Sequence, residues 1–500
     1  MISESTLEIA SVEAIVGLAR DALESGREEY VLPIVRAGAE HHRDATLWLW
    51  AALLEQALQE HQTALESFAK AAAINPNGFR IAHMHAQCAL EAGLPAATLF
   101  ERARSLRPQN STAFIGFTAA LAAEREADRA VALLQDALNG DPYWTAGHER
   151  FAQLLATLGR PAEATSSLEA AIRRFPSEPG LWETLLYVQL RHGAYAALGE
   201  IVGRARAQGV MSPEFAIYEA IHAAQFDDAL FPHALFEGAP AVAEDSLRNW
   251  RIRHLLRVGA VEAALPIVDE ALSADPDAEI WSLAATAWRL AGDERSEWLK
   301  GNPGLVAVID LKDKLPPLDG LASVLRAMHG AQGEYLDQSV RGGTQTSGSL
   351  FNRVDPMVRS VRAAAIEAVG EFVAKLPAQD LRHPMLCHPR NRPIRFAGSW
   401  SVLLKSGGRH SNHIHPQGWI SSALYIELPP RTEGEHDDAG WLTLGEPDDK
   451  LGLNLPPWRT IEPKPGRLVL FPSWMWHGTR PFQDGERLTV AFDVAPPRGQ

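Results

Sequence analysis

The chain has 500 residues, a hydrophobic share of 46% and a formal net charge of -15. This length exceeds what one hydrophobic core usually organises, so at least two domains are expected. The acidic balance disfavours broad contact with the phosphates of nucleic acid, which would repel the protein.

Two cysteines and the N-terminal residues indicate the compartment. Cys88 and Cys387 lie far apart in the sequence, which excludes a disulfide framework and argues against a cysteine zinc site. The N-terminus carries acidic residues where a secretory signal would be basic, and no apolar run is long enough to span a bilayer. We therefore expect a cytoplasmic protein without a nucleic-acid or membrane partner.

The first 300 residues are rich in alanine and leucine and repeat one spacing of small and bulky side chains. Copies begin at residues 64, 96, 130 and 164, so successive offsets are 32, 34 and 34 residues. Their members are Ala64, Phe68, Ala71 and Pro76; Ala96, Phe100, Ala103 and Pro108; Ala130, Leu134, Ala137 and Pro142; and Ala164, Leu168, Ala171 and Pro176. Such a period is typical of helix-turn-helix repeats, in which alanine allows close helix approach and proline ends the second helix.

Two large aromatic residues fit the same repeat. Trp48 and Phe114 fall sixteen residues before their alanines, where the tetratricopeptide pattern has a large first-helix residue. This resemblance implies an α-solenoid over residues 1–300. The register weakens after Pro176 before it returns, so an irregular section is expected at residues 209–247.

Stacked repeats of this kind form a concave groove that suits peptides. The repeats could recruit a substrate, mediate homodimerisation or cap the second domain. Recruitment ranks first among the three, by analogy with other proteins.

A change of period near residues 300–303, in KGNPG, marks the boundary of a second domain at 301–500. Residues 304–311 predict a strand and residues 318–329 an amphipathic helix. The stretch DQSVRGGTQT at 337–346 is too polar and glycine-rich to build a core and predicts a loop. Arg341 in this loop is a candidate substrate contact. The alternative is a solvated arginine held by the turn.

The rest of this domain predicts one helix and then a series of strands. Asp355 before Pro356 predicts a helix start, and apolar residues recur at helical spacing up to Leu376. From residue 394, short strands separated by turns predict a sandwich or barrel: IRFAGSWSVLL, GWISSALYIEL, GWLTL, GRLVLF and RLTVAFDV. Alternation in the second strand directs Ser421 and Tyr425 towards the cavity and the opposite face towards the helices.

Histidines in these strands suggest a metal site. His413 and His415 are separated by one residue and would share one strand face, so they could bind one ion together. A third histidine, His477, follows in FPSWMWHGT, and Arg487 and Thr489 share a face ten residues later. Three imidazoles and a spaced arginine indicate a small barrel that holds a metal and an anionic co-substrate.

Several motifs in this region resemble one family. They are Trp400, HIHP at 413–416, SSALY ending at Tyr425, LVLFPSWMWHGT at 468–479 and ERLTVAFDV at 486–494. They resemble the 2-oxoglutarate- and iron(II)-dependent oxygenases related to prolyl hydroxylases, and DQSVRGGTQT resembles the subgroup whose oxygenase domain follows tetratricopeptide repeats. The resemblance implies a multidomain α and α+β protein, with an α-solenoid before a double-stranded β-helix (jelly-roll or cupin-like) domain and its supporting helices.

The same resemblance implies cofactors and a reaction. Fe(II) would be held by His413, His415 and His477, and 2-oxoglutarate would be bound by Arg487, Thr489 and Tyr425. The expected reaction uses O2, converts 2-oxoglutarate to succinate and hydroxylates an unactivated C–H bond. A protein or peptide side chain is the preferred substrate, and a small molecule is the alternative.

One position departs from the family pattern. The wider superfamily has a carboxylate where this chain has His415, so three imidazoles would leave the ferrous charge to the co-substrate. An acidic ligand could instead come from the loop that contains Glu435, Asp437 and Asp438.

Other histidines and two tryptophans near the motifs have less specific roles. Four histidines are expected at the surface or behind the ligands: His383, His388, His410 and His436. Trp474 and Trp476 are expected to pack around the distal ligand and exclude water.

Two other classes of protein fit part of the pattern. One is a non-catalytic repeat adaptor with a degenerate barrel, against which the retained histidines and arginine argue. The other is a three-histidine dioxygenase that does not use 2-oxoglutarate and would gain nothing evident from Arg487.

Overall fold

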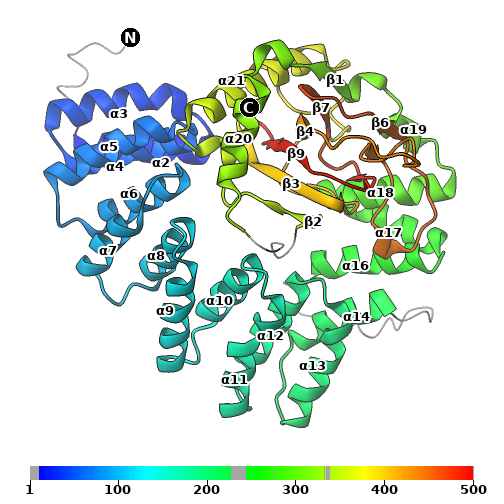
Figure 1. Cartoon of the computed structure of the whole chain (residues 1–500), viewed down its shortest axis with the longest axis horizontal. Coiled ribbons are helices and arrows are strands. Elements are labelled where there is room, and N and C mark those ends of the chain that lie inside the picture. Colours follow the sequence, from blue (N-terminus) through cyan, green and yellow to red (C-terminus); the bar gives the residue numbers. More distant parts are fainter. Residues whose placement is uncertain (1–10, 227–243, 275, 332, 334–337, 499–500) are drawn as a thin grey trace.

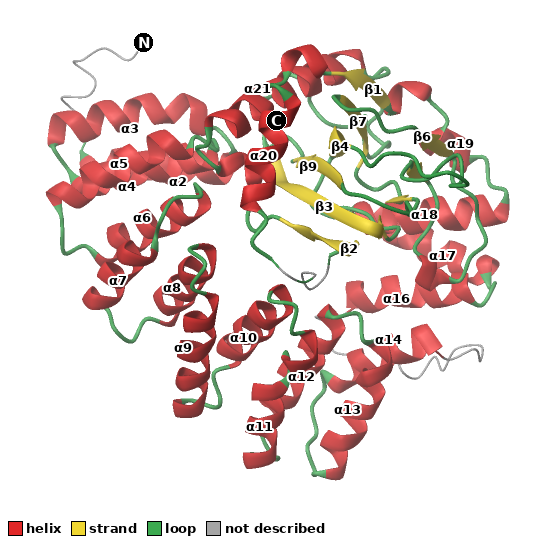
Figure 2. Cartoon of the chain, in the orientation of Figure 1, coloured by secondary structure: helices red, strands yellow, loops and turns green. Residues whose placement is uncertain are grey.

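A computed structural model describes residues 11–226, 244–274, 276–331, 333 and 338–498. The helices of the N-terminal part form a curved array, and the strands lie in the C-terminal part (Figures 1 and 2). Both ends of the array contact the strand-containing domain, so the described chain closes into a ring (Figure 1). Within these ranges, every helix is too short or too polar to cross a membrane.

The N-terminal array consists of antiparallel helix pairs. Its helices are α2 (Val12–Ser25), α3 (Glu28–His42), α4 (Ala45–Ala57), α5 (His61–Ile74), α6 (Phe79–Glu91), α7 (Ala97–Leu106), α8 (Ser111–Ala123), α9 (Ala127–Gly140), α10 (Thr145–Thr157), α11 (Ser166–Arg174), α12 (Pro179–Arg191), α13 (Tyr195–Ala207), α14 (Phe215–Phe226), α16 (Glu244–Arg257), α17 (Val261–Ser273), α18 (Ala278–Ala291) and α19 (Arg295–Lys300).

The predicted repeat is confirmed by where its residues lie. The bulky residues Phe68, Phe100, Leu134 and Leu168 are all fully buried between helices. Each proline of the pattern follows the end of its helix by two residues, as Pro76 follows α5, because proline cannot continue the backbone ladder. The result is the tetratricopeptide-like solenoid that the spacing predicts.

The section expected to be irregular, 209–247, is helical at 215–226 and 244–247, whereas residues 209–214 are irregular. Helix α14 packs against α13 and α16 and so continues the array. Residues 227–243 of that section lie outside the described ranges.

The C-terminal domain contains two antiparallel sheets and supporting helices. Its helices are α20 (Leu318–Met328) and α21 (Pro356–Lys375), and its strands are β1 (Ala307–Asp310), β2 (Val340–Gln345), β3 (Phe396–His410), β4 (Ile420–Glu427), β5 (Leu442–Leu444), β6 (Arg459–Ile461), β7 (Arg467–Pro472), β8 (His477–Thr479) and β9 (Arg487–Val494). The larger sheet has the order β1-β7-β4-β9-β3-β2, and the smaller has the order β6-β5-β8.

One face of the larger sheet packs on helices α20 and α21. Leu424 and Ile426 of β4 and Val490 and Phe492 of β9 are buried in the same core as apolar residues of these helices. The alternate residues therefore face the other way, towards the smaller sheet, as the sequence predicts for Ser421 and Tyr425.

Helices of the solenoid complete the core on the side of the smaller sheet. Helices α16 to α18 share a buried cluster with β5, β6 and β7, in which Trp288 lies with Leu444 and Phe471. At the other end of the solenoid, Arg395 pairs with Glu28 and Glu29 at 2.7 and 2.9 Å. The sheet domain is thus held from both sides by the repeats.

The prediction of a loop at 337–346 is wrong for most of that stretch, because residues 340–345 form the edge strand β2. Its glycines permit this: Gly342 has φ 69°, where the ladder is irregular, and a Cβ on Gly343 would lie 2.5 Å from the carbonyl oxygen of Leu403. A polar composition does not prevent an edge strand, because one side of it stays exposed.

Candidate metal centre

The HIHP segment is not a strand, which corrects the prediction for His413 and His415. It crosses between β3 and β4 as irregular backbone, and only His413 pairs, in an isolated bridge. In this bridge the backbone of His413 exchanges two hydrogen bonds of 3.0 Å with that of His477. The bridge brings two predicted ligands from distant parts of the sequence side by side.

The close approach of these backbones depends on Gly478. A Cβ at this position would lie 2.2 Å from Asn412 Oδ1 and 3.0 Å from the carbonyl oxygen of His410. Any larger residue would push the HIHP segment away from β8.

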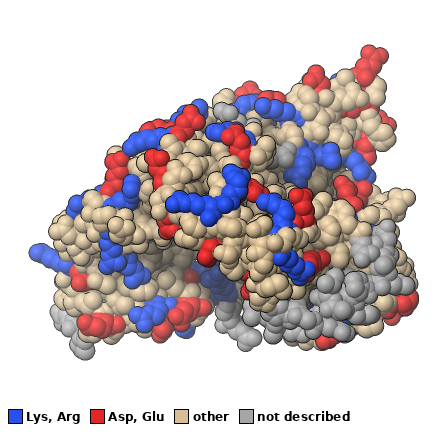
Figure 3. Space-filling model, turned by 90° about the horizontal axis from the view of Figure 1, so that it is seen from below, with Lys and Arg blue, Asp and Glu red and all other residues tan. Residues whose placement is uncertain are grey.

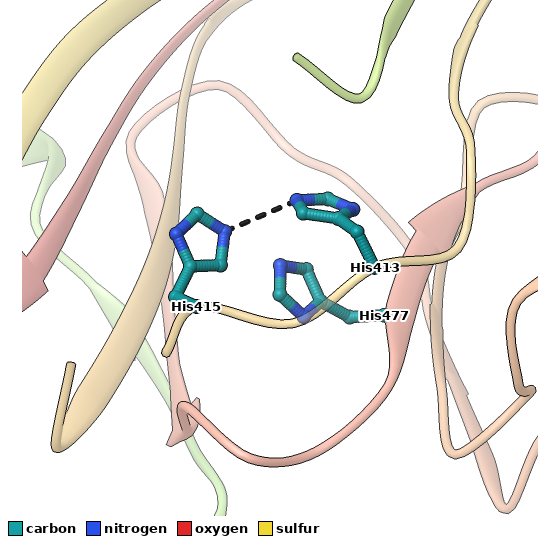
Figure 4. Close-up of side chains that lie close together, drawn as sticks. All are labelled: His413, His415 and His477. Atoms are coloured by element: carbon teal, nitrogen blue, oxygen red, sulfur yellow. Dashed lines mark hydrogen bonds between the residues drawn. The ribbon is translucent and has the colours of Figure 1, made fainter. Parts of the chain in front are cut away.

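Three imidazoles meet at one point. One nitrogen from each of His413, His415 and His477 lies within 4.8 Å of the others, and the Nε2 atoms of His413 and His415 are 3.1 Å apart (Figure 4). Two imidazole nitrogens bound to one metal at about 2.1 Å and at right angles would be separated by about 3.0 Å. The observed spacing is therefore that of two ligands of one ion.

The second nitrogen of each ring has an acceptor. Nδ1 of His413 lies 2.8 Å from the carbonyl oxygen of Ser411, and Nδ1 of His477 lies 3.0 Å from that of Met475. Nδ1 of His415 lies 2.6 Å from the carboxylate of Asp493. Because these oxygens only accept, the protons belong on Nδ1 and the Nε2 lone pairs face the shared centre.

This donor set fits a metal ion. The Nε2 atoms of His413 and His415, 3.1 Å apart, must either share a proton or bind one cation together, because two bare lone pairs at this distance repel each other. Burial, and then the neighbouring imidazoles, hold the pKa of both His413 and His477 well below the usual value, so these rings are neutral. Neutral imidazole is the form that binds a metal.

Aromatic side chains enclose the rings. Trp400 stacks on His415 with centroids 5.3 Å apart, and Phe471 lies at 4.7 Å from His477. The expectation for Trp476 is wrong, because its Nε1 points to Thr286 of α18 at 3.1 Å, and Trp474 packs with Trp458. Trp476 bonds to a helix of the repeats, and Trp474 lies in a core shared with the repeats, which the sequence of the sheet domain alone does not reveal.

The predicted co-substrate residues lie on the inner side of the sheets. Arg487, Thr489 and Asp493 alternate along β9, so they share the face that Asp493 directs at His415. Thr489 pairs with Tyr425 in the β4–β9 ladder.

Arg487 is 3% exposed and lacks a carboxylate partner among the described residues. Its Nη1 donates to the carbonyl oxygen of Gly440 at 3.0 Å, and its Nε has no acceptor there. The guanidinium lies 5.0 Å from the ring centre of Tyr425, whose buried hydroxyl is also unpaired. Burying a cation without a counter-ion raises the free energy of the folded protein, so a bound anion would stabilise this site.

His410 connects this arginine to the histidines. Its ring stacks on His413 with centroids 5.8 Å apart, and Ser339 Oγ lies 3.0 Å from its Nδ1 and 3.1 Å from His413 Nε2. Burial, and then the charge of Arg487, lower the pKa of His410 to about 3. His410 thus lies next to the three candidate metal ligands and is not one of them.

The remaining histidines and acids named by the sequence lie elsewhere. His383 Nε2 donates to the carbonyl oxygen of Leu299, and His388 packs on Trp419. In the acidic loop, Glu435 accepts from the backbone of Gln483. Asp438 pairs with His436 and Arg480, and Asp437 pairs with Arg431 at the surface. Within the described ranges, the group that could hold a metal consists of the three histidines.

Arg341 lies on β2 and lines the same cavity as His413 and His415. Its Nη1 donates to the carbonyl oxygens of Gln338 and Val340 at 2.6 and 2.8 Å. The structure therefore places Arg341 near the candidate metal centre, and part of its guanidinium is bonded to the backbone of neighbouring residues.

Three residues around the histidines were missed by sequence reasoning. Asp493 could have been found, because it continues the alternation of Arg487 and Thr489. Ser421, which donates to Asp493 at 2.6 Å, was assigned to the correct face but not to this contact. Ser339 gives no local signal in the sequence.

One family comparison matches this region. Residues 398–493 match the model of the family described as "Putative 2OG-Fe(II) oxygenase". The C-terminal domain carries the sequence pattern of this oxygenase family. The match extends from β3 to β9 and includes the three histidines and Arg487. No curated protein matches the chain.

Solved structures that resemble part of the chain include tetratricopeptide-repeat proteins. MamA from Desulfovibrio magneticus RS-1 is 16% identical, with a TM-score of 0.29, and the match covers 33% of this chain and 96% of MamA. TTC0263, a thermophilic repeat protein from Thermus thermophilus, is 20% identical with a TM-score of 0.27 (36% and 100% covered). YrrB, "a TPR protein with an unusual peptide-binding site", is 18% identical with a TM-score of 0.28 (35% and 91% covered).

Proposed function

We propose that this protein is a 2-oxoglutarate- and Fe(II)-dependent oxygenase that hydroxylates a polypeptide side chain. The observation that carries the proposal is the convergence of three Nε2 atoms whose rings are each fixed through Nδ1. Together with the family match of residues 398–493, it supports an iron site rather than a degenerate barrel.

In this proposal His413, His415 and His477 hold Fe(II). Asp493 fixes the orientation of His415 and contributes one negative charge close to the metal without being a ligand. Three neutral imidazoles then leave coordination positions for 2-oxoglutarate and O2. When bound, iron and 2-oxoglutarate would supply an oxidation in which O2 gives one atom to the substrate C–H bond and one to succinate, with release of CO2.

Arg487 binds the distal carboxylate of 2-oxoglutarate, with Thr489 and Tyr425 as further donors. The support is physical: the buried guanidinium has no acidic partner within the described residues, and the Tyr425 hydroxyl beside it has no acceptor. An enzyme that used only O2 and three histidines would gain nothing from this buried cation.

We further propose the domain division at 1–300 and 301–500, with the repeats positioning the substrate. In support, the cavity beside His413 is lined on its far side by the turn between α12 and α13. A substrate that reached the metal through this cavity would touch both domains.

Succinate formation tests the proposed function. Full-length protein is supplied with Fe(II), O2 and 2-oxoglutarate, and succinate is measured for the wild type, His477→Ala and, as a control, His436→Ala at an exposed site. We expect succinate from the wild type and the control, and loss of at least about 100-fold in His477→Ala. Consumption of O2 without succinate would instead favour the dioxygenase that does not use 2-oxoglutarate.

A further inference from the structure

A cavity of about 1100 Å³ connects the metal centre with the solenoid. His413 and His415 line one side of it, and Tyr195 at the start of α13 lines the other. This volume exceeds the range of about 300–1000 Å³ that is usual for small-molecule sites. The cavity is therefore large enough for a segment of polypeptide.

Two arginines lie opposite each other in the wall of this cavity. Arg341 of β2 and Arg409 of β3 are register partners in an antiparallel ladder, so their side chains leave the sheet on the same side. Two positive charges directly opposite each other in a ladder are unfavourable, so Arg409 would gain from an anionic partner. Arg409 is exposed and makes no ion pair with the described residues.

A third cation reaches the cavity beside the repeats. Lys450 Nζ lies 4.3 Å from the ring centre of Tyr195 and has no acidic partner among the described residues. Two of the lining acids are already paired, since Asp448 contacts Arg253 at 2.6 Å and Asp493 contacts His415 at 2.6 Å. Of the acids in the described wall, only Asp449 adds an uncompensated negative charge.

The charge of the cavity contrasts with that of the chain. The whole sequence has a formal net charge of -15, and in the view from below basic and acidic side chains are interspersed over the surface (Figure 3). A basic cavity in an acidic protein indicates an anionic ligand, because the overall charge would otherwise repel it.

The edge of the larger sheet offers a means of holding an extended chain. Strand β2 ends the sheet order and pairs only with β3 in the described part of the chain. The cavity is lined by two residues of this strand, Arg341 and Gln345, and by Gln338 just before it. An extended peptide could therefore hydrogen-bond along β2 while it lies between the sheet and the repeats.

We propose that the cavity binds an extended, acidic segment of a polypeptide, whose carboxylate side chains contact Arg409 and Arg341 while a neighbouring residue reaches the three histidines. This inference rests on the proposed function for what happens at the metal, but the binding step does not need catalysis. Arg409 is then a specificity-determining residue, and the repeats supply the opposite wall through Tyr195 and Gly193.

Peptide binding to the full-length protein tests this inference. The probes are two pools of fluorescein-labelled 12-residue peptides, identical in composition except that every third position is aspartate in one and asparagine in the other. Fluorescence polarisation at low salt gives both affinities. We expect the aspartate pool to bind about tenfold more tightly, as one charge-assisted hydrogen bond implies, although the net charge of the protein favours the opposite order.

Matched variants locate the effect. Arg409→Ala should remove the preference for aspartate, whereas Arg173→Ala should keep it, since Arg173 is exposed at the end of α11 and does not line the cavity. Equal affinity of the two pools, or an unchanged preference in Arg409→Ala, would overturn the inference. Binding of the aspartate pool without succinate formation would reject the proposed function and leave this inference standing.

Discussion

The carboxylate of Asp493 changes how the three-histidine site must be understood. Three neutral ligands leave both charges of a divalent ion uncompensated, but Asp493 lies 2.6 Å from Nδ1 of His415. Ser421 donates to the same carboxylate and fixes it. One negative charge would thus lie next to a bound ion while the coordination positions of that ion remain available.

Asp493→Asn should weaken divalent metal binding by about 10- to 100-fold, the usual effect of removing a partner of a metal-bound histidine. Calorimetric titration with Co(II) under argon measures this metal affinity. Asp438→Asn, at a surface pair with Arg480, is the control and should bind Co(II) like the wild type. Equal affinities in the wild type and Asp493→Asn would show that this carboxylate does not support a metal ligand.

Arg487→Gln should raise the dissociation constant for 2-oxoglutarate by at least about tenfold. It should leave the affinity for Co(II) unchanged, because the side chain of His410 lies between Arg487 and the three histidines. Titration of the Co(II)-loaded protein with 2-oxoglutarate measures the dissociation constant for 2-oxoglutarate. Arg431→Gln, at the surface, serves as the control. If both variants bind 2-oxoglutarate equally well, the anion site lies elsewhere.

At this scale the sequence predicts residue types better than their geometry. His413, His415 and His477 lie together as expected, yet a backbone bridge between His413 and His477, and not a strand face shared by His413 and His415, positions them. The Nδ1 acceptors of His413 and His477 are backbone oxygens, which every residue has, so no sequence pattern could reveal them.

Helix α20 is tied to the larger sheet by one histidine at its C-terminal end. His329 Nδ1 lies 2.9 Å from Thr344 Oγ1 on β2, and its Nε2 lies 3.1 Å from Ser401 Oγ on β3. Burial, followed by the charges of Arg326 and Arg353, lowers the pKa of His329 to about 4. This ring therefore stays neutral while it connects three elements.

The pKa of His329 predicts a loss of stability in acid. Between pH 6.5 and 4 the unfolded chain binds this proton and the folded protein does not, so lowering the pH through this window favours unfolding. From pH 7 to pH 5 the contribution is about 2 kcal/mol. Urea unfolding, followed by tryptophan fluorescence at both values, should show a smaller pH effect in His329→Gln than in the wild type. An equal pH effect in both proteins would contradict this prediction, and His436→Gln, at an exposed site, is the control.

Elements whose pattern recurs over many residues are predictable, whereas two of the three-residue strands are not. The repeats are visible because their spacing recurs over many residues, and α21 because Asp355 caps it as expected. Strands β6 and β8 have three residues each, too few for any alternation to stand out. Strand β2 was mistaken for a loop because its glycines conceal its pairing with β3.

In the whole molecule, the solenoid is part of the core of the sheet domain. Helices α16 to α18 cover the smaller sheet, and Trp476 of the sheet domain donates to Thr286 of α18. Of the roles considered for the repeats, capping is thus directly visible in the packing. Residues that appear to belong to separate domains in sequence bury each other's apolar surface.

Truncation should reveal this dependence. A fragment of residues 301–500 would expose Leu444, Phe471 and Trp474, which are buried against the repeats, and should aggregate. A fragment of residues 244–500 keeps α16 to α19 and should remain soluble with a cooperative thermal transition. Circular dichroism and size-exclusion chromatography compare the two. A cooperatively folded, monomeric 301–500 fragment would show that the repeats are dispensable for the sheet domain.

In the proposed site, three imidazoles hold one ferrous ion next to a buried arginine that binds 2-oxoglutarate. Anaerobic addition of Fe(II) and then 2-oxoglutarate to the full-length protein, followed by visible absorption, tests it most directly. We expect a charge-transfer band that saturates at one Fe(II) per chain in the wild type and is absent in His413→Ala. A wild type without the band, or a His413→Ala variant that retains it, would contradict the claim.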